Sequence, residues 1–281
     1  MYQPVLSHYQ LVDLAPPLEG VETCQLSLDL GLTQETVTLS VDGIEMPDGG
    51  VLSWESVEDI RDATNNCFGI EEGQALKIVT FSEPQNRVYS LMPTQGAPTM
   101  LISGIPMHRI KDTDPHRDTL AKVRASGRLV GRVLDTATGL GYTAIEASKT
   151  ADSVLTVELD PSAIEIARQN PWSRQLFQRE NIHQAIGDSF DIVSELEDAA
   201  FDRIVHDPPA FKLAGHLYST AFYCQLLRVL VPRGRLFHYV GDPESRSGRN
   251  ITRGVMRRLD EAGFQRIQRR PKAFGVVAVR P

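Results

Sequence analysis

Residues 132–141, with the sequence RVLDTATGLG, decide how the second half of this chain folds. A short apolar run ends on the carboxylate of Asp135, and the stretch closes on Gly139 and Gly141. Because glycine has no Cβ, such a turn lets a ligand approach the backbone closely. The stretch predicts a buried strand, a glycine turn and a helix that begins near residue 142. A nucleotide-like cofactor is expected at the carboxyl end of the strand.

Strand and helix patterns alternate regularly after this stretch. With helical patterns between them, four further segments predict strands: SVLTVEL, IHQAIG, FDRIVHDPP and GRLFHYVG. Two closing strands, FQRIQRR and AFGVVAVR, are separated by Pro271. Regular alternation predicts an α/β fold with a doubly wound parallel sheet. The short final link forces one of the closing strands to run antiparallel.

The segment before residue 103 has a different pattern. Period-two alternation in CQLSLDLGL and ETVTLSV, and the turn signal EMPDGGV, predict short strands. A single strand is expected over residues 73–82, a helix over 54–66 and an extended arm over 1–20. We therefore assign residues 1–102 to a small, mainly antiparallel β-rich domain and residues 103–281 to a larger one.

Two further segments carry local predictions. Pro115 after Asp114 predicts a helix start, and we expect Leu120 and Val123 of that helix to face inward. The segment GDPESRSGRN before the last helical pattern is expected to be a mobile loop.

Composition excludes several classes of protein. The 281 residues are 41% hydrophobic and 23% charged, which is typical of a soluble globular protein. No apolar run has the length of a membrane span, and no secretory signal opens the sequence, so a cytoplasmic protein is expected. Cys24, Cys67 and Cys224 lack metal spacing and are predicted to be reduced, mostly buried thiols. Because the seven histidines also lack paired ligand spacing, no metal site is predicted.

Charge is distributed unevenly along the chain. The net charge of −7 argues against a globally basic nucleic-acid-binding protein. From Glu244 to the end, however, ten Lys and Arg residues stand against three acidic ones. A solvated helix with arginine-rich flanks and a phosphate-binding face both explain this segment.

Acidic residues occur at four successive predicted strand ends: Asp135, Glu158, Asp188 and Asp207. Glu158 can accept hydrogen bonds from both hydroxyls of a ribose, as in dinucleotide folds. Asp188 can accept one from the exocyclic amine of an adenine, and Asp135 lies under the glycine turn, where a cationic amine is expected. The four carboxylates together predict a cofactor site at one edge of the sheet.

The sequence DPP at residues 207–209 predicts the acceptor side of this site. Both proline rings fix φ, so the backbone after Asp207 is extended and rigid. We expect Asp207 and Pro208 to orient a nucleophilic amine or hydroxyl. Four nearby side chains are candidates for proton handling: His206, Tyr218, His238 and Tyr239. Strand alternation places His206 on the opposite face of its strand from Asp207. At least one of His238 and Tyr239 is expected to face the cleft.

Four motifs of the chain resemble those of class I S-adenosylmethionine-dependent methyltransferases. VLDTATGLG is similar to the glycine-rich first motif, VELD to the ribose-binding motif, GDSF to the adenine-binding motif and DPPAF to the fourth motif. TGLGYTAIEA, NPWSR, HDPP and GRLFHYVGDP more closely resemble an archaeal-type group of predicted methyltransferases sometimes labelled spermine-synthase-like. The resemblance covers about residues 103–281 and implies a Rossmann-like methyltransferase domain whose last strand is antiparallel.

The resemblance also implies a cofactor and its ligands. The cofactor would be S-adenosyl-L-methionine, with no metal. The implied cofactor-binding residues are Asp135, Ala137, Thr138, Gly139, Gly141, Glu158, Leu159, Gly187, Asp188, Ser189 and Asp207. The implied acceptor-side residues are Asp207, Pro208, Tyr239 and His238. Two positions depart from the family pattern, because Ala137 replaces a usual glycine and Ala210 replaces a usual aromatic, with Phe211 one residue later.

Three functions are compatible with these residues. The first is methyl transfer to a nitrogen or oxygen acceptor in RNA or in a small molecule. The second is aminopropyl transfer from decarboxylated S-adenosylmethionine, because polyamine synthases share this fold. The third is a non-catalytic cofactor-binding module associated with RNA. The N-terminal segment fits a structural role, substrate gating or a homodimer contact, and no membrane partner is expected.

Overall fold

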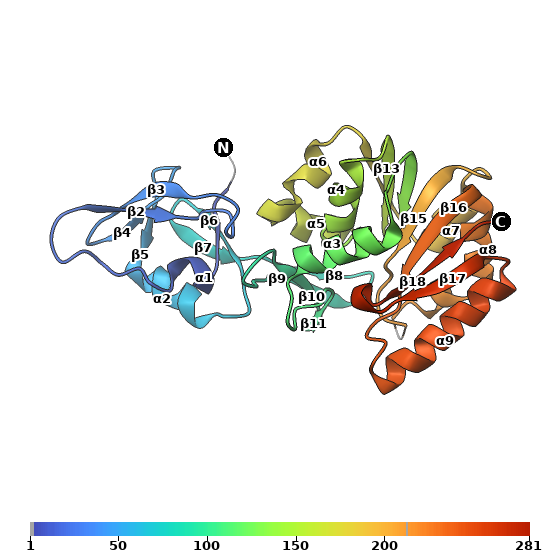
Figure 1. Ribbon diagram of the computed structural model, residues 1–281. Helices are drawn as coiled ribbons and strands as arrows, with labels where there is room; N and C mark the ends of the chain where they lie inside the picture. Colours follow the sequence, from blue (N-terminus) through green and yellow to red (C-terminus); the bar gives the residue numbers. More distant parts are fainter. Residues whose placement is uncertain (1–2, 212) are drawn as a thin grey trace. The chain divides into compact units, whose positions relative to one another are not determined.

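The computed structural model describes residues 3–211 and 213–281, without the side chains of residues 246 and 247 (Figure 1). The chain forms two compact units. The first comprises residues 1–116 and 162–174, and the second comprises residues 117–161 and 175–281.

The first unit contains three small antiparallel sheets, as predicted for the N-terminal segment. One sheet has the order β1 (Val5–Leu6), β6 (Phe68–Glu71), β7 (Gln74–Lys77). The next has the order β2 (Glu22–Leu26), β3 (Glu35–Leu39), β4 (Gly43–Glu45), β5 (Val51–Ser53). The third has the order β11 (Ile105–Pro106), β10 (Thr99–Ile102), β9 (Arg87–Met92), β8 (Val79–Ser82).

The prediction of a single strand over residues 73–82 is wrong. This segment is divided at Ile78 into β7 and β8, which belong to different sheets. The buried Ile78 donates its N–H to the carbonyl of Cys67 and accepts the N–H of Leu91. Its backbone therefore bonds to two different neighbours, and the chain passes there from one sheet to the next.

The prediction of an extended arm over residues 1–20 is also wrong, because Val5, Leu6 and Leu11 are buried and residues 8–11 form a helix. Ser7 and Gln10 form a capping box that starts the short helix α1 (His8–Leu11). Leu6 and Leu11 pack in the same core as Val57 of α2 (Trp54–Asp62). Helix α2 is capped by Ser53, which was expected, but it ends four residues before Asn66.

Seven strands form the sheet of the second unit, in the order β14-β13-β12-β15-β16-β18-β17. Their bounds are β12 (Arg132–Asp135), β13 (Ser153–Glu158), β14 (Ile182–Ile186), β15 (Phe201–His206), β16 (Leu230–Tyr239), β17 (Gln265–Arg270) and β18 (Gly275–Val279). Strands β12 to β16 run parallel, whereas β18 runs antiparallel to both β16 and β17. The predicted doubly wound α/β fold with an antiparallel last strand is confirmed.

Helices follow the strands in the expected alternation. They are α3 (Pro115–Ser126), α4 (Tyr142–Ser148), α5 (Pro161–Gln169), α6 (Arg174–Gln178), α7 (Ser189–Glu195), α8 (Thr220–Val229) and α9 (Arg246–Glu261). Figure 1 shows α9 lying along the β17–β18 end of the sheet. Helix α9 begins inside the predicted mobile loop, because the Ser245 side chain caps it by accepting the Gly248 N–H at 2.9 Å.

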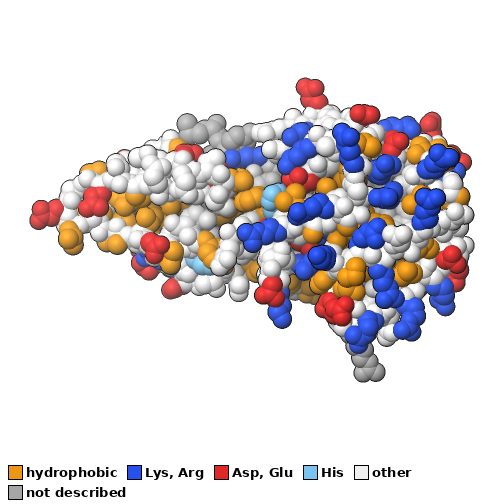
Figure 2. All heavy atoms as spheres, in the orientation of Figure 1, with side chains coloured by type: hydrophobic (Ala, Val, Ile, Leu, Met, Phe, Trp, Pro, Cys, Tyr) orange, Lys and Arg blue, Asp and Glu red, His pale blue; other side chains and the backbone are white. Residues whose placement is uncertain are grey.

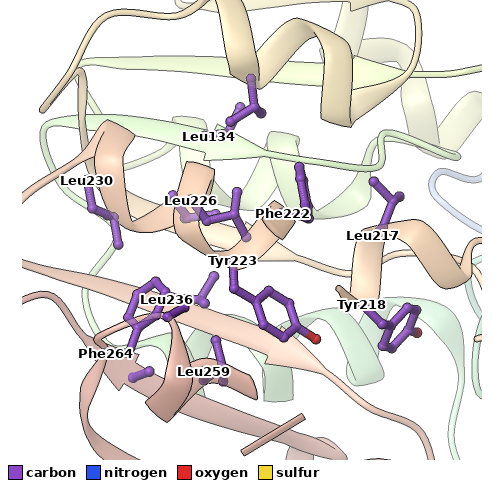
Figure 3. Packing of buried hydrophobic residues seen from close by; sticks show 14 of the residues in the cluster. Leu134, Leu217, Tyr218, Phe222, Tyr223, Leu226, Leu230, Leu236, Leu259 and Phe264 are labelled. Carbon is purple, nitrogen blue, oxygen red and sulfur yellow. The ribbon is translucent and has the colours of Figure 1, made fainter. Parts of the chain in front are cut away.

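The core beside β16 is formed by α8, α9 and the central strands. Phe222 and Leu226 of α8 are fully buried against Leu134 of β12, Leu236 of β16 and Leu259 of α9 (Figure 3). Removing each such side chain from water contributes roughly 1.5–3 kcal/mol. This packing fixes the carboxyl ends of β12 and β15, where the predicted site residues lie.

The cysteines are less buried than predicted. All three are free thiols, but only Cys67 is buried, while Cys24 is half-buried and Cys224 is exposed. Within residues 3–211 and 213–281, no helix is long and apolar enough to cross a membrane.

Gly275 in β18 provides a test of the packing between β18 and β16. A Cβ at this position would lie 2.5 Å from Phe237 Cζ and 2.8 Å from the His238 carbonyl oxygen. We expect Gly275→Ala to lower the free energy of unfolding by about 1–3 kcal/mol, measured by urea denaturation. Gly215→Ala is the control, because its Cβ would point into open space and should change stability by less than about 0.5 kcal/mol. Equal effects of the two substitutions would contradict this packing.

Candidate functional site

Asp135 is the most buried carboxylate of the predicted cofactor site. It ends β12, and its Oδ2 accepts a hydrogen bond of 2.9 Å from Thr156, whose hydroxyl is 2.7 Å from that of Thr138. The other oxygen, Oδ1, has no hydrogen bond of good geometry among the described residues, although the Ala137 N–H is close enough to Asp135 to favour its ionised form. Burial raises the pKa of Asp135 to about 7, although the Thr156 hydrogen bond opposes the shift. A buried carboxylate with an unsatisfied oxygen is suited to a cationic partner.

The glycine turn above Asp135 leaves bare backbone at one position. Gly139 and Gly141 have φ values of +50° and +77°, in the left-handed region that favours glycine. No atom lies within 4 Å of where a Gly139 Cβ would be, whereas a Gly141 Cβ would meet Leu176 at 2.6 Å. Ala137 lies half-buried at the start of this turn. Gly139 therefore offers an open surface to a ligand, while Gly141 allows the chain to enter α4 beside Leu176.

Glu158 ends β13, next to the glycine turn. Its Oε2 accepts the Gly139 N–H at 2.8 Å and its Oε1 accepts the Asp160 N–H at 3.1 Å. Burial raises the pKa of Glu158, and the two backbone hydrogen bonds oppose that shift. Each carboxylate oxygen has a second lone pair, so both can still accept a ribose hydroxyl.

Two apolar side chains are exposed beside Glu158. Leu159 follows it and is 48% exposed, and Ile186 ends the neighbouring strand β14 and is 51% exposed. Exposed apolar side chains at the carboxyl ends of adjacent strands can cover an aromatic ring. They complete the surroundings expected for the adenosyl part of a cofactor.

The GDSF segment is held by its own hydrogen bonds. Asp188 caps α7 by accepting the Phe190 N–H at 2.7 Å, and its Oδ2 lies 2.9 Å from Nε2 of His216. Ser189 donates to the Thr136 carbonyl at 2.6 Å, and Gly187 donates its N–H to the Glu158 carbonyl. Ser189 and Gly187 thus join α7 to β12 and β13. Asp188 remains partly exposed, and an adenine amine would share it with His216.

Asp207 lies in an ion network that the sequence did not indicate. Nζ of Lys122 lies 2.6 Å from Asp207 Oδ2 and 2.9 Å from Asp118 Oδ2, and it is 4.3 Å from the centre of the Tyr239 ring. The Lys122 side chain is only 3% exposed. Burial by itself lowers the pKa of Lys122, but the Asp207 and Asp118 charges outweigh it and raise that pKa. We call Asp118, Lys122 and Asp207 the Lys122 network.

The Lys122 network explains why α3 is oriented differently from the prediction. Leu120 and Val123, which were expected to face inward, are only half-buried. The helix instead buries a polar face: Asp118, Thr119, Lys122 and Ser126. The one available signal was an Asp and a Lys four residues apart, which lie on the same side of a helix.

His206 of β15 and His238 of β16 are interior residues. His238 is fully buried, with Nε2 2.9 Å from the Tyr223 hydroxyl and Nδ1 3.2 Å from the His206 carbonyl. Burial lowers its pKa well below the usual value, and both ring nitrogens are engaged. The prediction that His238 contacts the acceptor therefore does not fit the structure.

His206 lies behind its strand, as expected. Its nitrogens contact the Thr136 hydroxyl at 2.6 Å and the Leu217 carbonyl at 2.9 Å, and burial lowers its pKa to about 3. Tyr218 is buried and donates its hydroxyl hydrogen to the Pro209 carbonyl at 3.1 Å. Of the four candidates for proton handling, only Tyr239 is half-buried beside Asp207 and Lys122. Among the described residues, no three His, Cys, Asp or Glu side chains are arranged to hold a metal ion.

Comparison with known proteins identifies one matching family and several individual relatives. The family described as methyltransferase small domain matches residues 113–245. The uncharacterized protein MJ1233 of Methanocaldococcus jannaschii is 42% identical over 262 residues, covering 91% of this chain and 89% of that protein. A polyamine aminopropyltransferase of Mycobacterium tuberculosis is 32% identical over 100 residues, which are 34% of this chain and 19% of that enzyme.

Solved structures of spermidine synthase share the fold. One, in complex with the transition-state analogue AdoDATO, has a TM-score of 0.62, and 75% of this chain covers 78% of that chain. Another, from Thermotoga maritima, has a TM-score of 0.60, with coverages of 75% and 76%. Both are 18% identical to this chain, so they show the fold alone. These likenesses confirm a class I methyltransferase-like fold related to spermidine synthase-like proteins.

Lys122→Met tests whether the Lys122 network stabilises the fold. The substitution leaves the Asp118 and Asp207 carboxylates without their cation in a buried place. We expect the free energy of unfolding near pH 8 to fall by about 3–5 kcal/mol. The loss should be smaller near pH 5, because the stranded carboxylates can take up protons.

Lys149→Met is the matched control, because Lys149 is 46% exposed in its pair with Glu146. Losing that pair should cost less than about 1 kcal/mol. The role of the network would be contradicted if Lys122→Met and Lys149→Met lowered the free energy of unfolding in urea equally at both pH values.

Proposed function

Because this chain belongs to the same family as Methanocaldococcus jannaschii MJ1233 and contains a methyltransferase-like domain, we propose that it transfers a methyl group from S-adenosyl-L-methionine to a nitrogen or oxygen acceptor. The observation that most supports an adenosyl cofactor with an ammonium group is the unsatisfied Oδ1 of Asp135 beneath the open backbone of Gly139. An ammonium group at that position would complete the carboxylate.

The residues around Asp135 fit the remaining parts of such a cofactor. Glu158 would accept hydrogen bonds from the ribose hydroxyls, and Asp188 would accept one from the adenine amine. Leu159 and Ile186, both about half exposed, would cover the adenine ring. Thr138 would hold Asp135 in place through Thr156, to which both side chains are hydrogen-bonded.

The acceptor would bind beside Asp207. When bound, the cofactor supplies a methyl group already activated by a sulfonium, so the protein mainly has to align the acceptor. Lys122 fixes the Asp207 side chain, and Pro208 and Pro209 fix the backbone that follows. Phe211 is 45% exposed with its ring 5.3 Å from that of Tyr218, and it could stack on a planar acceptor. RNA and small molecules both remain proposed acceptors.

Aminopropyl transfer is the second candidate, and the likeness to spermidine synthase structures favours it. Its acceptor would be a polyamine, a chain of cationic amines that requires uncompensated carboxylates. Asp207 meets that requirement only in part, because its Oδ2 lies 2.6 Å from Nζ of Lys122, a cation that it shares with Asp118. The Lys122 network leaves fewer carboxylate oxygens free for a polycationic acceptor, which favours methyl transfer. A non-catalytic RNA-associated module remains the third candidate.

Thermal stabilisation by the two cofactors distinguishes the first two candidates. We expect S-adenosylmethionine and S-adenosylhomocysteine to raise the Tm of the full chain, and decarboxylated S-adenosylmethionine to raise it less at equal concentration. Stabilisation by the decarboxylated form alone would contradict methyl transfer.

The raised pKa of Asp135 predicts how cofactor affinity depends on pH. In the free folded protein its pKa of about 7 lies above the ordinary 3.8. Between pH 3.8 and pH 7 the folded protein therefore keeps a proton on Asp135 that the unfolded chain has already released. Stability from this group is thus present at low pH and lost as the pH rises through 7. A cationic amine binds only the ionised carboxylate, so S-adenosylhomocysteine should bind roughly 25-fold more tightly near pH 7.5 than near pH 5.5.

Calorimetric titration of two matched variants tests this assignment. Asp135→Asn should bind weakly at both pH values and show no pH dependence. Asp191→Asn, an exposed residue in the first turn of α7, should behave like the unmodified protein. Affinity that is equal at both pH values in the unmodified protein would rule out Asp135 as the partner of the amine.

A further inference from the structure

The second unit contains a cavity of about 540 Å³ whose wall is mostly arginine. Its lining residues are Arg128, Arg203, Arg233, Arg235, Gln265, Arg266, Val279, Arg280 and Pro281. No acidic side chain is among them. We call this cavity the arginine pocket.

The arginine pocket lies at the opposite edge of the sheet from Asp135 and Asp207. Arg203 of β15 pairs in register with Arg235 of β16, near the start of β15. Asp207 follows the other end of β15, about 13 Å further along the strand at the usual rise per residue. The pocket is therefore separate from the proposed cofactor site.

The positive charge of the pocket is not compensated within the protein. None of its six arginines forms an ion pair with a carboxylate in the part of the chain that the structure describes. Three of them instead donate hydrogen bonds to backbone carbonyls. Arg203 donates to Arg128 and Asp202, Arg235 to Ser126, and Arg280 to Arg228 and Leu230. These bonds orient the guanidinium groups without cancelling their charge.

Two of the arginines occupy unfavourable backbone positions. Arg233 and Arg266 have φ values of +65° and +51°, in the left-handed region that a residue with a Cβ seldom adopts. Glycine or asparagine adopts that region more readily. The backbone around Arg233 is also pinned, because its N–H bonds to the Arg280 carbonyl and the Arg280 N–H bonds to the Gly234 carbonyl.

We infer that the arginine pocket binds a compact polyphosphate, an anion with at least two adjacent phosphate groups. Guanidinium groups bind phosphate oxygens in pairs, and six of them exceed what a single carboxylate or phosphate can neutralise. The pocket is concave and has the size of a small-molecule site, whereas a polynucleotide follows an open basic groove. Figure 2 shows further Lys and Arg side chains over the elements α9, β17 and β18, which would attract such an anion.

Calorimetric titration of the full chain with tripolyphosphate tests this inference, at an ionic strength of about 0.15 M. The double substitution Arg233→Gln with Arg266→Gln should weaken binding about tenfold or more. The control is Arg253→Gln with Arg269→Gln, which removes the same charge from exposed residues outside the lining. It should weaken binding less than about twofold.

Three further measurements complete the test. ATP should compete with tripolyphosphate, because both present adjacent phosphates. Arg233→Gly should weaken binding while raising the Tm, since it removes a strained residue together with its charge. Stabilisation by S-adenosylhomocysteine should be unchanged in the Arg233→Gln, Arg266→Gln protein, so this inference and the proposed function can fail independently.

Three results would overturn the inference. The first is the absence of tripolyphosphate binding. The second is equal weakening in the control pair, which would indicate unspecific attraction to a basic surface. The third is binding of a single-stranded oligoribonucleotide lacking a 5′-triphosphate when tripolyphosphate does not bind.

Discussion

The buried ammonium of Lys122 determines what the acceptor side of the site can do. Placing a lysine almost completely out of water costs several kcal/mol, and the pair of carboxylates at 2.6 and 2.9 Å offsets that cost. The same contacts fix Asp207 in one position and attach α3 to the end of β15. They also engage Oδ2 of Asp207, which leaves fewer carboxylate oxygens free to bind a polycation. A stabilising ion network and a restriction on the substrate thus arise from one interaction.

The sheet of the second unit separates two kinds of charge along its strands. The carboxyl edge carries Asp135, Glu158 and Asp207, of which Asp135 retains an unsatisfied oxygen. The opposite edge carries the arginine pocket, whose guanidinium groups bond to carbonyls rather than to acids. Because a parallel sheet gathers all its carboxyl ends on one side, the two edges can recognise different ligands without interfering.

The fold elements that were predicted correctly are those whose signals are local. The glycine turn, the acids at strand ends and the closing pair of strands each lie within a few residues, and together they predicted the sheet and its antiparallel strand. Lys122 could not be predicted in its role, because its partner Asp207 is 85 positions away along the chain. His238 was misplaced because strand position alone does not show that Tyr223 of α8 covers it. The arginine pocket likewise gathers residues from five separated segments, so the count of basic residues near the C-terminus indicated charge but no cavity.

Transfer of a labelled methyl group is the most direct measurement of the central claim. S-Adenosylmethionine labelled in its methyl group would be incubated with the full chain and an extract of cells lacking this protein, then separated into RNA, protein and small-molecule fractions. The account predicts label in the RNA or the small-molecule fraction, and none with the Asp135→Asn protein. If S-adenosylmethionine stabilises the protein but all three fractions of the extract stay unlabelled, methyl transfer is contradicted. That result would favour a non-catalytic module.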